Sequence, residues 1–237
     1  MNNKYNILTV VNEGYAPFIK IFVNSLFEHQ DLQNVDTVYI FDTGLGTGTK
    51  KYLLDFPKVE VIDSGINSQS SRIHDEGWKK STYSKTKFLL KVLEDSNLPT
   101  IMIDADSIFY YNFEDLLDWN CDFVACRRDR EGFSKYIGSF FGALDVEKSK
   151  QFIELWIKNI DFLQNNTELK HCESPALAKT IDENPELKCQ DIAEQLVSAV
   201  FPDESSRIFH LKSDYYATTI EQRLNLPHSR VFARRYL

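Results

Sequence analysis

The chain has 237 residues, of which 43% are hydrophobic, 13% aromatic and 26% charged. These proportions are typical of a globular protein with a substantial core, and they exclude disordered and fibrous chains. The net charge of −8, from 27 Lys and Arg against 35 Asp and Glu, disfavours general binding to nucleic acid.

Membrane and secretory signals are not evident in the sequence. No apolar run approaches the ~18 residues of a membrane span, and no hydrophobic leader opens the chain. The four cysteines lack the close pairs of a zinc site and are too few for a disulfide framework. We therefore expect a soluble, cytoplasmic protein that forms a single domain over 1–237.

The first half of the chain alternates short apolar runs with amphipathic segments. Residues 6–12 predict a strand, and 16–28 predict a helix with Pro17 in its first turn. Further strands are expected at 37–41, 59–62 and 100–103, helices at 49–55 and 84–94, and a polar loop at 65–80. This alternation predicts a largely parallel sheet with helices on both faces.

The second half is less regular. We expect strands at 123–126, 136–144 and 207–211, one or two helical turns at 113–118, and helices at 146–163, 174–181 and 189–199. No linker, repeat or low-complexity tract separates the two halves. The second half is therefore expected to complete the same sheet.

Two carboxylates follow the most apolar of these strands. Asp104 and Asp106 come directly after Ile101-Met102-Ile103, and ligands of an open α/β sheet bind where its strands end. Two such carboxylates can hold a divalent cation that stabilises a diphosphate leaving group. A D-x-D can also be a strand-ending turn, but the apolar strand before it favours a metal site.

Residues 85–109 (KTKFLLKVLEDSNLPTIMIDADSIF) resemble the stretch of GT-A-fold glycosyltransferases in which a lysine-bearing helix precedes a strand ending in D-x-D. Four further segments, at 9–15, 41–45, 136–144 and 208–212, resemble other segments of proteins in this family and occur in the same order. The last resembles a strand whose histidine completes the metal site in glycogenin-like and bacterial galactosyltransferase-like branches. The resemblance implies an α/β, GT-A-type Rossmann-like three-layer sandwich with a mostly parallel central sheet.

The same resemblance implies roles for individual residues. The nucleotide-sugar-binding half would be 1–106 and the acceptor-side half 107–237. Mn²⁺ or Mg²⁺ would be held by Asp104, Asp106 and His210, with Asp104 also near the ribose, and a neutral imidazole is a suitable ligand for Mn²⁺. The first strand and its loop would supply the donor-binding residues Thr9, Asn12 and Tyr15. Candidate cations for the diphosphate are Arg72, Lys85 and Lys212.

A candidate for the reacting centre lies within 190–195. On the helix expected there, Asp191 and Glu194 are three residues apart and share a face. The segment resembles the acidic or amide pair of the family, in either of two registers. In an inverting enzyme one carboxylate would be the general base for the acceptor hydroxyl, and in a retaining enzyme the group would stabilise an oxocarbenium-like species.

Three other segments carry possible binding functions. The loop from Gly44 to Lys50 follows a strand and precedes a helix, but its spacing matches no phosphate-loop motif, which favours a flexible turn. The run Arg127-Arg128-Asp129-Arg130 indicates either a solvated loop or a site for an acidic acceptor or the donor. The tail 230–237 mixes arginines with aromatics, which suits weak peripheral contact with an anionic membrane.

The leading hypothesis is a metal-dependent glycosyltransferase that moves a hexose from a nucleoside-diphosphate sugar, with a UDP-sugar expected, to a hydroxyl of a saccharide, lipid-linked or protein acceptor. One alternative is a sugar-phosphate nucleotidyltransferase, which the acidic and aromatic loop 12–17 disfavours. Another is a non-catalytic module that binds nucleotide sugars or glycans. The donor base, the sugar and the acceptor depend on pocket shape.

Overall fold

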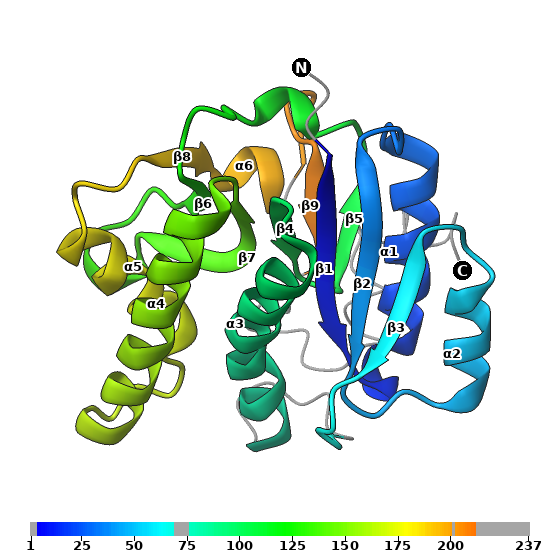
Figure 1. Cartoon of the computed structure of the whole chain (residues 1–237), viewed down its shortest axis with the longest axis horizontal. Coiled ribbons are helices and arrows are strands. Elements are labelled where there is room, and N and C mark those ends of the chain that lie inside the picture. Colours follow the sequence, from blue (N-terminus) through cyan, green and yellow to red (C-terminus); the bar gives the residue numbers. More distant parts are fainter. Residues whose placement is uncertain (1–3, 69–75, 201, 212–237) are drawn as a thin grey trace.

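The computed structural model describes residues 4–68, 76–200 and 202–211, and its centre is a seven-stranded sheet in the order β3-β2-β1-β4-β7-β6-β8 (Figure 1). The strands of this sheet are β1 (Tyr5–Val11), β2 (Val35–Asp42), β3 (Val59–Asp63), β4 (Thr100–Ile103), β6 (Phe123–Arg127), β7 (Tyr136–Ala143) and β8 (Cys189–Ala193). A separate two-stranded ribbon consists of β5 (Ser107–Phe109) and β9 (Ile208–His210).

The sheet is mostly parallel, as predicted. β7 is antiparallel to its neighbours β4 and β6, whereas the other neighbouring strands are parallel. Strands from both halves of the chain share this one sheet, with β4 next to β7. The C-terminal ends of β1 and β4 therefore meet at one edge, beside the connection between β6 and β7.

Helices cover both faces of the sheet and produce three layers (Figure 1). The helices are α1 (Ala16–His29), α2 (Thr47–Leu54), α3 (Glu76–Ser96), α4 (Val146–Asn166), α5 (Glu173–Glu183) and α6 (Glu194–Val197), with 3-10 turns η1 (Glu13–Tyr15), η2 (Glu114–Leu116) and η3 (Gly132–Ser134). In β1, Ile7 packs in the cluster that contains α1, and the next residue, Leu8, packs in the cluster of α3, α4 and α5. Because successive side chains of a strand point to opposite faces, this one sheet contributes to two hydrophobic cores.

The sequence predictions were wrong in two places. Residues 189–199 were expected to be one helix, but Cys189–Ala193 is strand β8 and only Glu194–Val197 makes a helical turn. β8 pairs along its length with β6, and this pairing overrides the helical spacing of its apolar residues. Helix α3 begins at Glu76 instead of residue 84, because its first turns are polar and give no apolar period.

None of the helices in the described part of the chain is both long enough and apolar enough to cross a membrane. The longest ones, α3 and α4, each have 21 residues and carry charged side chains on their outer faces. Both instead use one apolar stripe to cover the sheet.

Candidate functional site

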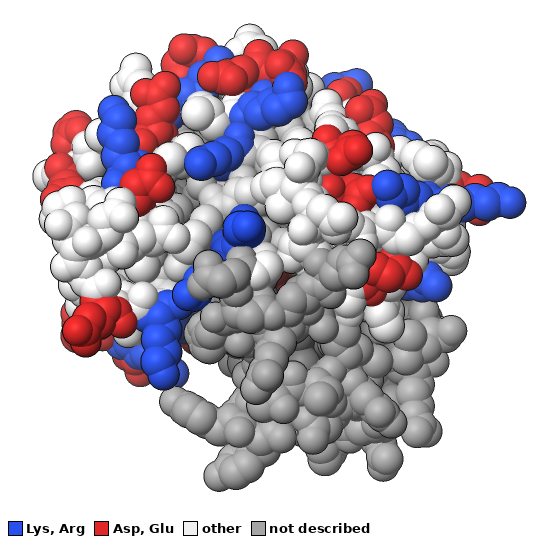
Figure 2. All heavy atoms as spheres, turned by 90° about the horizontal axis from the view of Figure 1, so that it is seen from below, with Lys and Arg blue, Asp and Glu red and all other residues white. Residues whose placement is uncertain are grey.

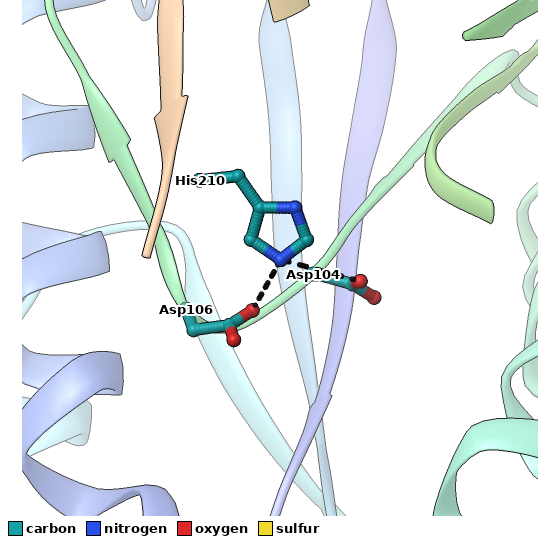
Figure 3. A group of neighbouring side chains, drawn as sticks. All are labelled: Asp104, Asp106 and His210. Atoms are coloured by element: carbon teal, nitrogen blue, oxygen red, sulfur yellow. Dashed lines mark hydrogen bonds and ion pairs between the residues drawn. The ribbon is translucent and has the colours of Figure 1, made fainter. Parts of the chain in front are cut away.

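The two carboxylates of the D-x-D lie at the C-terminal end of β4, and a histidine distant in sequence joins them (Figure 3). β5 starts directly after Asp106 and pairs antiparallel with β9, which places Ser107 opposite His210. The backbone N–H of Leu211 also donates to the carbonyl of Asp106 at 2.8 Å. This ribbon brings His210 beside Asp106 across 104 residues of sequence.

The three side chains converge closely. His210 Nε2 lies 2.9 Å from Asp106 Oδ1 and 3.7 Å from Asp104 Oδ2. One ligand atom from each of the three residues fits within a mutual separation of 4.8 Å. Two carboxylates and one imidazole suit Mn²⁺ or Mg²⁺, and Mn²⁺ accepts the nitrogen ligand more readily. The chemistry of these residues therefore fits a divalent cation.

A chain of hydroxyls orients the imidazole. His210 is 4% exposed, and its Nδ1 lies 3.0 Å from Ser198 Oγ, which is 2.8 Å from Ser139 Oγ. Because Ser198 occupies Nδ1, the nitrogen directed at the carboxylates is Nε2 (Figure 3). Ligand histidines in proteins are oriented by such a partner on the second nitrogen.

Lys85 links Asp104 to a second buried carboxylate. Its ammonium lies 2.6 Å from Asp104 Oδ1, 3.1 Å from Glu173 Oε1 and 3.2 Å from the carbonyl oxygen of Gly138. Burial of this side chain, which is 6% exposed, acts to lower its pKa, but the two carboxylates raise the pKa above its ordinary value. Lys85 thus stays charged, with hydrogen bonds to Asp104 and Gly138 and an ion pair to Glu173.

Glu173 reaches Lys85 over a glycine in β7. A Cβ atom added to Gly138 would lie 2.1 Å from Glu173 Oε1 and 2.4 Å from its carboxyl carbon. The hydroxyl of Ser174 also approaches this group, 3.2 Å from Glu173 Oε2. The absence of a side chain at position 138 therefore makes room for the carboxylate.

We expect Gly138→Ala to destabilise the protein by about 1–3 kcal/mol, because the methyl group must displace the Glu173 carboxylate from Lys85. Gly48→Ala is the matched control: a Cβ atom added to Gly48 in α2 would meet no other group within 4 Å, so a gain of about 0.4–1 kcal/mol is expected. Urea unfolding of the two variants measures both effects. Equal stabilities of the variants would contradict the close approach at position 138.

These groups line one cavity of about 330 Å³. Its wall includes, from the end of β1, Val10, Val11, Asn12 and Tyr15; from α3, Ser81, Thr82 and Lys85; after β4, Asp104, Ala105 and Asp106; from the β6–β7 region, Arg128, Phe133, Ser134, Ile137 and Ser139; and from the remaining segments, His171, Glu173, Ser174, Pro175 and His210. The metal-ligand set thus lies inside a cavity large enough for part of a small ligand.

Only some of the residues predicted to bind the sugar donor line the cavity. Asn12 and Tyr15 line the cavity, but Thr9 is 0% exposed and lies outside the lining. The neighbouring Val10 and Val11 face the cavity in its place. Arg72 and Lys212 fall outside the described residues, as does the tail 230–237.

The two predicted catalytic carboxylates do not share a helix face. Asp191 lies on strand β8, where its Oδ1 accepts a hydrogen bond from the Tyr136 hydroxyl at 2.7 Å. Glu194 starts α6 and pairs with Arg128 at 3.2 Å. Neither carboxylate is among the residues that line the cavity. The expectation that both carboxylates share one helix face is therefore wrong, because the segment changes from strand to helix between them.

The glycine-rich loop before α2 is closed by a carboxylate of the protein. Glu13 accepts from the N–H of Gly46 at 2.7 Å and from the Thr49 hydroxyl at 3.0 Å. These groups stand at the start of the helix, where a phosphate would bind in a phosphate loop. Glu13 thus takes the position of an anionic ligand and ties this loop to the loop after β1.

Several polar residues of the site were missed from the sequence. They are Ser139, His171, Glu173, Ser174 and Ser198. The expected helix at 174–181 gave one available signal, because an acidic residue directly before Ser174 and Pro175 is typical of a helix start. Ser139 lies in the segment 136–144, which resembles part of the family, but its bond to Ser198 and the role of Ser198 depend on the position of His210.

No curated protein and no protein-family model matches this sequence. Among solved structures, the chain is similar to the galactosyltransferase LgtC in complex with donor and acceptor sugar analogues, with a TM-score of 0.66, 11% identity, and coverage of 98% of this chain and 93% of that one. An active-site mutant of LgtC gives a TM-score of 0.65 at the same identity and coverage. The chain therefore has the GT-A-type fold of this galactosyltransferase, as the sequence resemblance implied.

Proposed function

We propose that this protein is a metal-dependent glycosyltransferase that transfers a hexose from a nucleoside-diphosphate sugar, a UDP-sugar foremost, to a hydroxyl of an acceptor. The observation that carries the proposal is the convergence of Asp104, Asp106 and His210 inside the cavity at the end of β4. The fold shared with LgtC, whose structure holds donor and acceptor sugar analogues, supports a donor and an acceptor at this edge of the sheet.

Different residues of the cavity would bind the cation, bind the nucleotide and orient His210. The two aspartates and His210 Nε2 would hold Mn²⁺ or Mg²⁺, which supplies positive charge to stabilise the departing diphosphate. Asn12 and Tyr15, at the β1 side of the cavity, would bind the nucleotide. Ser198 fixes the ring of His210 so that Nε2 faces the site.

Lys85 has a positioning role in this proposal. Glu173 and the Gly138 carbonyl hold its ammonium, which holds Asp104 Oδ1 and leaves Oδ2 as the oxygen on the side of His210. Because three protein oxygens surround its ammonium, Lys85 would position Asp104 instead of contacting the diphosphate. Asp191 and Glu194, which lie outside the cavity lining, receive no role at the reacting bond.

The first experiment is calorimetric titration of UDP into the purified protein with Mn²⁺ and then with EDTA, repeated for GDP. The proposal predicts that UDP binds in the presence of Mn²⁺ and that EDTA removes this binding, because Asp104, Asp106 and His210 would hold a cation whose positive charge favours the diphosphate. Absence of binding by both nucleotides with Mn²⁺ present would overturn the proposal. Binding of UDP without hydrolysis or transfer across a panel of acceptors would instead identify a nucleotide-sugar-binding module.

A further inference from the structure

The cavity extends past the metal-ligand set to a second part, on the far side of β4 from β1. The sheet order β1-β4-β7-β6 puts the loop after β1 on one side of Asp104 and the β6–β7 connection on the other. That connection contributes Arg128, Phe133 and Ser134 to the cavity wall. If the proposed nucleotide occupies the β1 side, the β6–β7 side is the space left for the acceptor.

Arg128 is the available cation of this cavity. Among the described lining residues the other Lys or Arg is Lys85, whose ammonium already has three oxygen partners. The Arg128 side chain is 18% exposed, and its Nε lies 3.2 Å from Glu194 Oε1. No residue in the described part of the chain hydrogen-bonds its two Nη groups. Glu194 thus fixes the plane of the guanidinium through one nitrogen and leaves the other two for a ligand.

An aromatic side chain lines the same cavity as this guanidinium. Phe133 is 52% exposed on the wall of the cavity, which is unusual for a phenylalanine in a chain with an extensive core. The connection that carries it is fixed at its base, because the Arg128 N–H donates to the Lys135 carbonyl at 2.8 Å and Lys135 pairs with Asp182 of α5. The ring is therefore held at the cavity, where its face can cover the apolar face of a sugar ring.

Positive side chains gather on the side of the molecule toward which the strands β1 and β4 run. Figure 2 shows the face toward which β1 runs, and several blue side chains lie near the middle of its described part, with most red ones nearer its edge. This local arrangement differs from the net charge of −8 of the whole chain. Positive side chains on this side of the sheet favour the approach of an anion.

We infer that the acceptor is a saccharide that carries a carboxylate, such as a hexuronic acid, bound by the Nη groups of Arg128 with its ring against Phe133. A single guanidinium with two free nitrogens matches the geometry and the single charge of a carboxylate. A phosphate dianion would leave more charge uncompensated at this end of the cavity than a carboxylate, because Glu194 already offsets part of the charge of Arg128. The inference rests on the proposed function and names the acceptor class of the same site.

Two sugar probes that differ only in the carboxylate provide the test. We would measure the binding of p-nitrophenyl β-D-glucuronide and p-nitrophenyl β-D-glucoside by saturation-transfer NMR, with and without Mg²⁺ and UDP. The wild-type protein is expected to bind the glucuronide about tenfold or more tightly than the glucoside, since a charge-assisted pair of hydrogen bonds is gained. Arg128→Gln removes this difference, whereas Phe133→Ala weakens both probes by a similar factor.

Arg130→Gln is the matched control, because Arg130 belongs to the same basic run but is exposed and does not line the cavity. It should keep the wild-type preference for the glucuronide. Equal binding of the two probes by the wild type, or a preference that survives in Arg128→Gln, would overturn the inference. UDP affinity separates the two ideas: intact Mn²⁺-dependent UDP binding without any preference rejects the acidic acceptor alone, whereas absence of UDP binding rejects the proposed function.

Discussion

Asp106→Asn is expected to abolish the Mn²⁺-dependent part of UDP binding and to lower transfer by about 100-fold or more, because it removes a charged oxygen ligand from the metal set. The amide keeps the size of the side chain. The backbone bond from Leu211 to the carbonyl of residue 106 is also unaffected, so the ribbon of β5 and β9 should remain folded. Titration of UDP with Mn²⁺ and with EDTA measures the binding, and thermal unfolding checks the fold.

Glu60→Gln is a suitable control for this charge change, because Glu60 is exposed on β3, the edge strand three positions from β4 in the sheet. It removes the same charge far from the cavity and should leave UDP binding and turnover unchanged. If Asp106→Asn kept the wild-type difference between Mn²⁺ and EDTA, the assignment of Asp106 as a metal ligand would be wrong.

Lys85→Met should lower the free energy of unfolding by about 3–5 kcal/mol, the usual cost of removing one partner from a buried ion pair. Asp104 and Glu173 both approach the ammonium, and Glu173 is almost completely buried. Without the lysine, two carboxylates remain close together with no cation between them. Urea unfolding at neutral pH measures the loss.

Lys91→Met on the same helix is the control. Lys91 pairs with Asp95 at 2.9 Å on the exposed face of α3, and loss of a surface pair of this kind changes stability by less than about 0.5 kcal/mol. The double variant Lys85→Met/Glu173→Gln should recover part of the loss, because it removes one uncompensated charge. Wild-type stability of Lys85→Met would show that the buried cluster is not held by charge.

Local pattern was sufficient for much of the fold. The apolar runs predicted β1, β2, β3 and β4, and the amphipathic segments predicted α1, α2, α4 and α5. Each of these elements buries one face or one stripe, so the spacing of its apolar residues can be recognised in the sequence. The alternation of strands and helices then determined the class of sheet. The local pattern of apolar residues failed at 189–199, where the pairing of the edge strand β8 with β6 decided the conformation.

The sequence by itself determined the sheet and the two carboxylates that end β4, because a run of four buried residues followed by Asp104 and Asp106 is a local feature. Its resemblance to a family added His210, which the structure places beside Asp106. Only the tertiary structure decided which other side chains line the same cavity: Glu173, which pairs with Lys85 over Gly138, and Arg128 and Phe133 of the β6–β7 connection. These contacts join segments far apart in the chain, and the register of the strands that brings them together is fixed by packing of the whole core.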